Sequence, residues 1–165
     1  MAPGMRWAER AQAAGLDRAT TALLTLSLVL AFLHHADHVL RVDHSGWPFR
    51  PMVTTFTYSL LAYPMVLFAL FGARRLYWLR WALLAIATGV TIYAHTALES
   101  PRMQFAMWAE NRSLDPHAAG VHNLPGVRSP ILGTLAVVIG MALNLTAIAA
   151  TLAMARRGLA LGRGA

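Results

Sequence analysis

The chain has 165 residues, of which 57% are hydrophobic and only 13% are charged. A soluble domain carries about a quarter charged residues, so this composition excludes an ordinary soluble protein and favours one compact unit in a membrane. There is no cysteine, which excludes disulfides and thiol chemistry. All fourteen basic residues are arginine and the formal net charge is +7. With its abundant alanine, leucine and glycine, the chain has a composition typical of GC-rich bacterial genomes.

The first 18 residues form a polar, alanine-rich stretch, which we interpret as a cytoplasmic N-terminal segment containing a short interfacial helix. Asp17 is the candidate N-cap of the helix that follows. A charged start before an apolar run is also typical of a signal peptide. No small-residue cleavage site follows Leu33, however, so the run is predicted to be an uncleaved anchor.

Four apolar stretches approach or exceed the roughly 20 residues that are needed to cross the hydrocarbon core. They cover about residues 19–39, 52–71, 76–98 and 130–155. The sequence therefore predicts an all-α fold, a polytopic integral membrane protein with four transmembrane helices in an antiparallel bundle over residues 19–157.

Local signals refine this outline. Pro64 predicts a kink in the second span because it removes a backbone hydrogen bond. Arg80 and its aromatic neighbours indicate an interfacial belt at the start of the third span. Ser100 and Pro101 predict the start of a short helix within a long extracytoplasmic loop, residues 100–129. Residues 158–165 are predicted to form an unordered cytoplasmic tail.

Four spans place both termini on one side of the membrane. That side holds nine arginines and two carboxylates, whereas the other side holds five of each. The positive-inside rule therefore predicts that both termini are cytoplasmic and that the protein lies in the bacterial inner membrane. The basic excess is explained by topology and by the lipid bilayer as partner, so no nucleic-acid partner is expected.

Histidines mark the end of the first span in the stretch His34-His35-Ala36-Asp37-His38. All seven histidines fall on the predicted extracytoplasmic side. The first and third spans run parallel, so His34 and His38 can face His95 and Glu99, which are four residues apart on one helix face. Ionisable residues at membrane depth are costly and usually functional.

Imidazole and carboxylate groups are suitable ligands for zinc, copper and iron, and helical bundles build metal centres from such pairs on facing helices. We therefore predict a transition-metal site used for catalysis or metal handling. The predicted ligands are His34, Asp37, His38, His95 and Glu99, with His35 and His44 as weaker candidates. In an enzyme, Asp37 or Tyr58 could transfer protons.

Three other interpretations remain. The histidines can be hydrated side chains at the interface, with Asp37 paired to Arg41 at i+4. The chain can be a haem b protein with axial ligands such as His35 and His95. It can also be a homo-oligomer or a non-catalytic accessory subunit of a membrane complex. The fourth span carries a stripe of small residues. The stripe is compatible both with an accessory subunit and with close packing inside the bundle. Its residues are Gly133, Ala136, Gly140 and Asn144.

Overall fold

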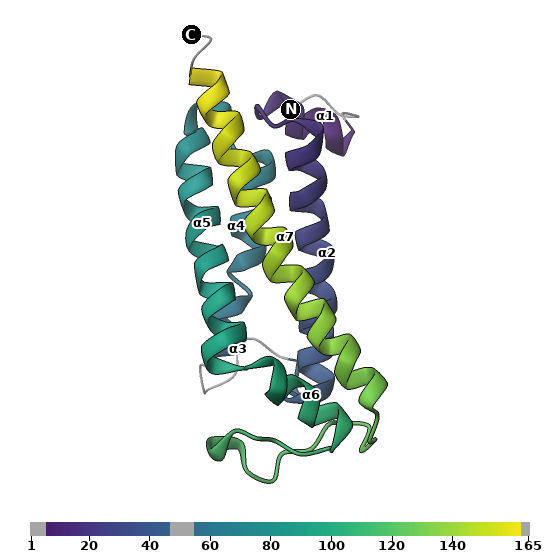
Figure 1. Cartoon of the computed structure of the whole chain (residues 1–165). Coiled ribbons are helices and arrows are strands. Elements are labelled where there is room, and N and C mark those ends of the chain that lie inside the picture. Colours follow the sequence, from purple (N-terminus) through teal and green to yellow (C-terminus); the bar gives the residue numbers. More distant parts are fainter. Residues whose placement is uncertain (1–5, 47–54, 163–165) are drawn as a thin grey trace.

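The computed structural model of the chain describes residues 6–46 and 55–162, and within these residues every regular element is helical (Figure 1). Three stretches are long and apolar enough to cross a membrane: Arg18–Arg41, Arg74–Leu98 and Pro130–Gly162. A shorter apolar stretch covers Phe56–Phe71. The elements in order are α1 (Trp7–Ala13), α2 (Arg18–Arg41), α3 (Thr55–Ser59), α4 (Ala62–Phe71), the 3₁₀ turn η1 (Arg74–Leu76), α5 (Tyr77–Tyr93), the π-helical η2 (Ala94–Leu98), α6 (Pro101–Ala109), the 3₁₀ turn η3 (Pro116–Ala118) and α7 (Pro130–Gly162).

Two predicted helix starts are confirmed. The Asp17 carboxylate accepts a hydrogen bond from the backbone N–H of Thr20 at 2.7 Å, which caps α2. The Ser100 hydroxyl accepts one from the backbone N–H of Met103 at 3.3 Å, and Pro101 opens α6. Polar side chains therefore set where these two helices begin.

The predicted second span is interrupted, as Pro64 indicated. Helix α3 ends at Ser59 and α4 begins at Ala62, so the irregular turn lies three to four residues before the proline. This is where the missing proline N–H would have bonded to the carbonyl of Leu60. The first residues of the predicted span, 52–54, lie outside the described residues.

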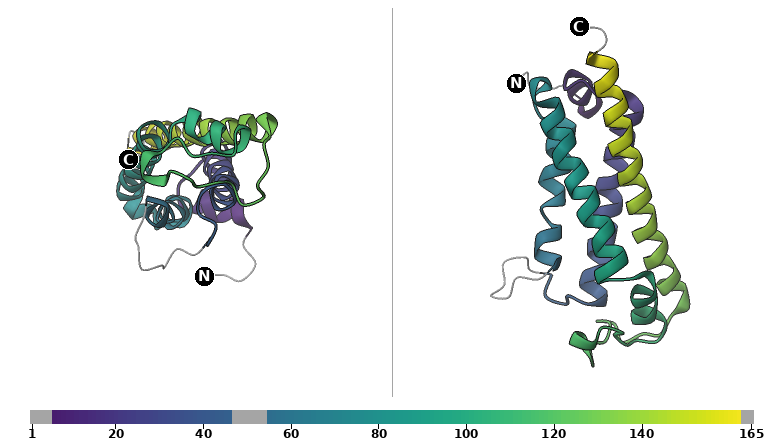
Figure 2. Two further views of the ribbon diagram at one scale, coloured as in Figure 1. Left: turned by 90° about the horizontal axis from the view of Figure 1, so that it is seen from below. Right: turned by 60° about the vertical axis from the view of Figure 1, so that its left-hand side comes forward.

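The long helices run side by side, with α1 and the end of α7 at one end of the molecule and α6 with its following loop at the other (Figures 1 and 2). The apolar core lies in the half near α1 and consists of Ala11, Leu16, Leu24, Val66, Ala69, Leu70, Tyr77, Leu84, Ala150 and Met154. The opposite half holds the polar groups that form the candidate site.

Helix α7 uses small residues for close packing. All four residues of the predicted stripe are buried. A Cβ atom on Gly133 would lie 2.8 Å from the backbone oxygen of Phe105 in α6, so only glycine permits this approach. The helix continues to Gly162 instead of ending near Ala155, since Gly158 packs against Tyr77 and Trp78. Residues 158–162 are thus helical rather than an unordered tail, and residues 163–165 lie outside the described residues.

Arg80, which the sequence places in an aromatic and cationic belt, is buried inside the bundle. Its side chain is fully buried, and its guanidinium donates hydrogen bonds to the carbonyl oxygens of Ala14, Phe68 and Ala69. These carbonyls lie at the C-terminal ends of α1 and α4, where a cation is favourable. Arg80 therefore links α5 to α1 and α4.

Candidate functional site

Two of the predicted site histidines, from helices far apart in the sequence, lie in direct contact. The ring centroids of His34 on α2 and His95 on η2 are 4.3 Å apart in an edge-to-face arrangement. Both residues are buried, with 6% and 7% of their surface exposed. This confirms the expectation that the ends of the first and third long helices bring these histidines together.

The His95 ring is oriented by α7. Its Nδ1 lies 3.0 Å from the Oδ1 of Asn144 in a buried hydrogen bond. Because an amide oxygen only accepts, Nδ1 carries the proton and Nε2 keeps its lone pair. His95 belongs to a π-helical turn, a feature that is frequent at functional sites and that the sequence pattern did not predict.

The third predicted histidine ligand, His38, stacks on the ring of Phe56 from α3, with centroids 4.7 Å apart. The Nδ1 atoms of His34 and His38 are both buried, and neither has a hydrogen-bond partner in the described part of the chain. Leaving a buried polar atom unpaired costs about 1–3 kcal/mol. Two such atoms, four residues apart on one helix, are therefore unusual and need an explanation.

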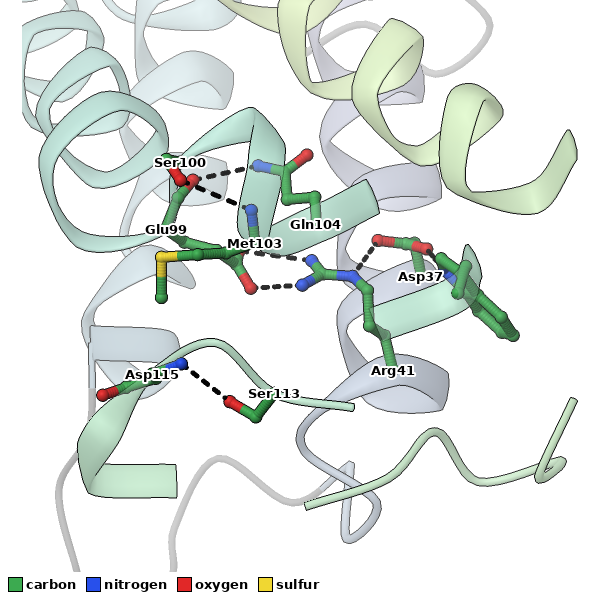
Figure 3. Close-up of polar contacts among 9 residues, drawn as sticks. Asp37, Arg41, Glu99, Ser100, Met103, Gln104, Ser113 and Asp115 are labelled. Carbon is green, nitrogen blue, oxygen red and sulfur yellow. Dashed lines mark hydrogen bonds and ion pairs between the residues drawn. The ribbon is translucent and has the colours of Figure 1, made fainter. Parts of the chain in front are cut away.

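The two predicted carboxylate ligands are held by Arg41, whose side chain is fully buried (Figure 3). Its Nε donates to Asp37 at 2.8 Å, and its two terminal nitrogens bond to the two carboxylate oxygens of Glu99. The indole N–H of Trp108 in α6 donates to the second oxygen of Asp37 at 2.7 Å. The i+4 pairing of Asp37 with Arg41 is therefore confirmed, and Arg41 also links α2 to the start of α6.

Glu99 lies just beyond the third long helix. Burial by itself raises the pKa of the Glu99 carboxyl, but the charge and hydrogen bonds of Arg41 outweigh burial and lower the pKa to about 2. Glu99 is thus a carboxylate at neutral pH. Together with Asp37 and Arg41 it leaves a net charge of −1 beside the histidines.

The hydrogen-bond partners of His35 come from its own helix and from α3 and α4. Its Nδ1 is 3.0 Å from the carbonyl oxygen of Ala31 and 2.8 Å from the hydroxyl of Tyr63, and its Nε2 is 2.7 Å from the hydroxyl of Ser59. Both ring nitrogens are therefore engaged. In this arrangement His35 has no free nitrogen for a metal or for haem iron.

The remaining candidates lie at the surface. The side chain of Tyr58 is 63% exposed. His44 is exposed and lines a surface pocket together with His122, whose Nδ1 is 2.6 Å from the carbonyl oxygen of Asn111. Neither Tyr58 nor His44 is part of the ring contacts of His34 with His95 and of His38 with Phe56.

Within residues 6–46 and 55–162, no three histidine or carboxylate side chains already form a ligand set for a metal ion. Sequence reasoning missed the second partner of Arg41 and the role of Trp108. The sequence did contain a signal for the second partner of Arg41, because an arginine buried at the end of an apolar helix needs carboxylate partners.

No family model matches this chain, and neither a curated protein nor a solved structure matches it.

Proposed function

We propose that this chain is a bacterial inner-membrane protein with four spans and cytoplasmic termini, and that it binds a transition-metal ion near its extracytoplasmic end. The ligands in this proposal are the imidazoles of His34, His38 and His95. The observation that carries it is the pair of buried Nδ1 atoms on His34 and His38, which have no partner within the described residues, together with the contact between His34 and the imidazole of His95.

Metal ligation would satisfy the atoms that hydrogen bonding leaves unpaired. A neutral imidazole presents one lone pair, and zinc, copper and iron are the ions that it suits. The amide of Asn144 supports this use of His95, because a second-shell acceptor on one ring nitrogen fixes the other as the ligand. The described rings would have to rotate about their side-chain torsions to converge on one ion.

The surrounding charges support a cation. Three neutral imidazoles bring no charge, whereas Arg41 and its two carboxylates carry a net −1 next to them. The carboxylates are committed to Arg41, so Asp37 and Glu99 act outside the ligand shell in this proposal. Three protein ligands leave one tetrahedral position open, as in catalytic zinc sites.

Elemental analysis of the untagged protein in mild detergent tests the proposal. We expect near-stoichiometric zinc, copper or iron in the wild type and a loss of at least tenfold in the His34→Ala/His38→Ala variant. The His117→Ala/His122→Ala variant, which removes two histidines of the loop, is the matched control and should retain the metal.

Two results would overturn the metal site. One is wild-type protein that stays metal-free after incubation with Zn²⁺, Cu²⁺ and Fe²⁺. The other is equal metal content in the wild type and in the His34/His38 variant. Either result would favour an accessory subunit in which the histidines only pack.

A further inference from the structure

The hydrogen bonds of His35 are those of a general base, and they join it to Ala31, Ser59 and Tyr63 rather than to the proposed metal ligands. A backbone carbonyl can only accept a hydrogen bond, so the 3.0 Å contact with Ala31 requires a proton on Nδ1 of His35. In the neutral ring Nε2 then carries the lone pair. The group within hydrogen-bond distance of that lone pair is the Ser59 hydroxyl, at 2.7 Å.

The Ser59 hydroxyl has one hydrogen and two acceptors for it, the Nε2 of His35 and the carbonyl oxygen of Phe56 at 2.7 Å. The hydroxyl therefore lies next to a base whose tautomer is already set for taking a proton. A nucleophile, a base within 2.6–3.2 Å and a third group that orients the base are the features of an activated serine. Here the carbonyl of Ala31 is the orienting group, with the Tyr63 hydroxyl 2.8 Å from the same nitrogen.

Ser59 lies beside exposed residues. It is half-buried at the end of α3, next to the interruption of the second apolar stretch, and its neighbours Tyr58 and Leu61 are 63% and 54% exposed. Leu61 is apolar and Tyr58 carries an aromatic ring, so both side chains would meet lipid at this level of a membrane. A substrate that reaches Ser59 from this side must therefore carry an apolar chain.

We propose that Ser59 and His35 form a catalytic dyad that hydrolyses a carboxylic ester of an apolar acyl chain at the level of the membrane interface. Ser59 Oγ bonds to the carbonyl carbon while its proton passes to His35 Nε2. The bond from the carbonyl carbon to the alcohol oxygen breaks, and the alcohol leaves with that proton. Water then attacks the acyl-serine, gives a proton to Nε2 and releases the carboxylic acid as Ser59 regains its proton.

The first experiment measures covalent labelling of the full-length protein in detergent by an alkyl fluorophosphonate, with the labelled residue identified by peptide mass spectrometry. We expect Ser59 to be labelled, with fluoride as the leaving group, and Ser59→Ala to lose the label. His35→Gln should slow labelling by about 10²-fold or more, since a general base contributes about that factor. Thr96→Ala, which removes an exposed hydroxyl bonded only to its own helix, should label like the wild type.

The second experiment uses the absence of cysteine in the natural chain. Ser59→Cys and Thr96→Cys each introduce a single thiol, and a thiol beside an imidazole base has a lowered pKa. We expect the thiol at position 59 to react with iodoacetamide at pH 6 at least tenfold faster than the thiol at position 96, although position 59 is less exposed. This comparison remains informative if His35→Gln fails to fold.

The proposal is overturned if no fluorophosphonate reaches Ser59, if His35→Gln labels as fast as the wild type, or if the thiol at position 59 reacts no faster than that at position 96. The dyad does not rest on the metal site. Protein treated with a chelator should label at the same rate, so failure of one proposal is distinguishable from failure of the other.

Discussion

Among the described residues, Arg41 stands out as a buried cation with two carboxylate partners. It is fully buried between two carboxylates, and removing one partner of a buried ion pair typically costs about 3–5 kcal/mol. Because Glu99 is partly exposed, we expect Arg41→Ala to destabilise the fold by about 3 kcal/mol, at the low end of that range. The free energy of unfolding in mixed detergent micelles measures this.

Arg112 supplies the control for that experiment. It pairs with Glu110 on the surface, where the arginine side chain is 60% exposed. An exposed pair of this kind contributes about 0–1 kcal/mol. An Arg41→Ala variant that loses no more stability than Arg112→Ala would contradict a structural role for the buried network.

The acid stability of the protein should depend on Glu99. Arg41 lowers the pKa of the folded carboxyl from the ordinary value of 4.5 to about 2. A lowered folded-state pKa contributes stability that is present above the ordinary value and is lost as the pH falls toward the folded value. We expect the free energy of unfolding to decrease between about pH 4.5 and pH 2, and to decrease less steeply in Glu99→Gln. If the free energy of unfolding falls equally steeply with pH in both proteins, another group causes the loss of stability in acid.

The Asn144→Ala variant tests whether the hydrogen bond to Asn144 orients His95 for metal binding. If His95 is a metal ligand, Asn144→Ala frees the ring and should weaken Zn²⁺ binding by about 10- to 100-fold, the usual effect of losing a second-shell partner. Competition with a chelator measures the affinity. Thr146→Ala, which removes a hydroxyl bonded to its own helix, should bind like the wild type. Unchanged affinity in Asn144→Ala would argue against His95 as a ligand.

At the scale of the helices, the sequence allowed us to predict those features that depend on a few neighbouring residues. The cap of α2 by Asp17, the start of α6 and the interruption before Pro64 each depend on a few neighbouring residues. The Arg41–Glu99 contact joins residues 58 apart, and its existence depends on how α2 is rotated about its axis. The π-helical turn around His95 likewise follows from tertiary packing, which a hydrophobic pattern does not encode.

The packing of α7 on α6 gives a prediction at this scale. Gly133→Ala would place a Cβ atom 2.8 Å from the backbone oxygen of Phe105, so α6 has to move. Overpacking of this kind costs about 1–3 kcal/mol. Gly89→Ala is the matched control: no atom lies within 4 Å of its Cβ position in the described structure, so it should not destabilise the helix. Unfolding measurements in which both variants behave alike would contradict close α6–α7 packing.

For the whole molecule, the two ends have different characters. The apolar core surrounds Leu24 and Leu70 in the half near α1, whereas the buried residues of the candidate site, such as His34 and Arg41, lie toward α6. Apolar burial thus dominates one half, and a hydrogen-bonded polar cluster lies in the other. Ionisable residues are costly within a membrane, so in the proposed membrane setting the apolar half would offset the cost of the polar one.

The number of spans decides where the C-terminus lies. Residues 55–71 cover about 25 Å as a helix, at the short end of what crosses the hydrocarbon core. If this stretch crosses, there are four spans and both termini share one side; if it does not, the three long helices place the termini on opposite sides. We expect a green fluorescent protein fused after Arg75 or after Ala165 to fluoresce, and alkaline phosphatase fused after Ala118 to be active. Active phosphatase after Ala165, with fluorescence at the N-terminus, would mean that only three helices cross. Arg75 would then lie on the extracytoplasmic side, contrary to the positive-inside rule.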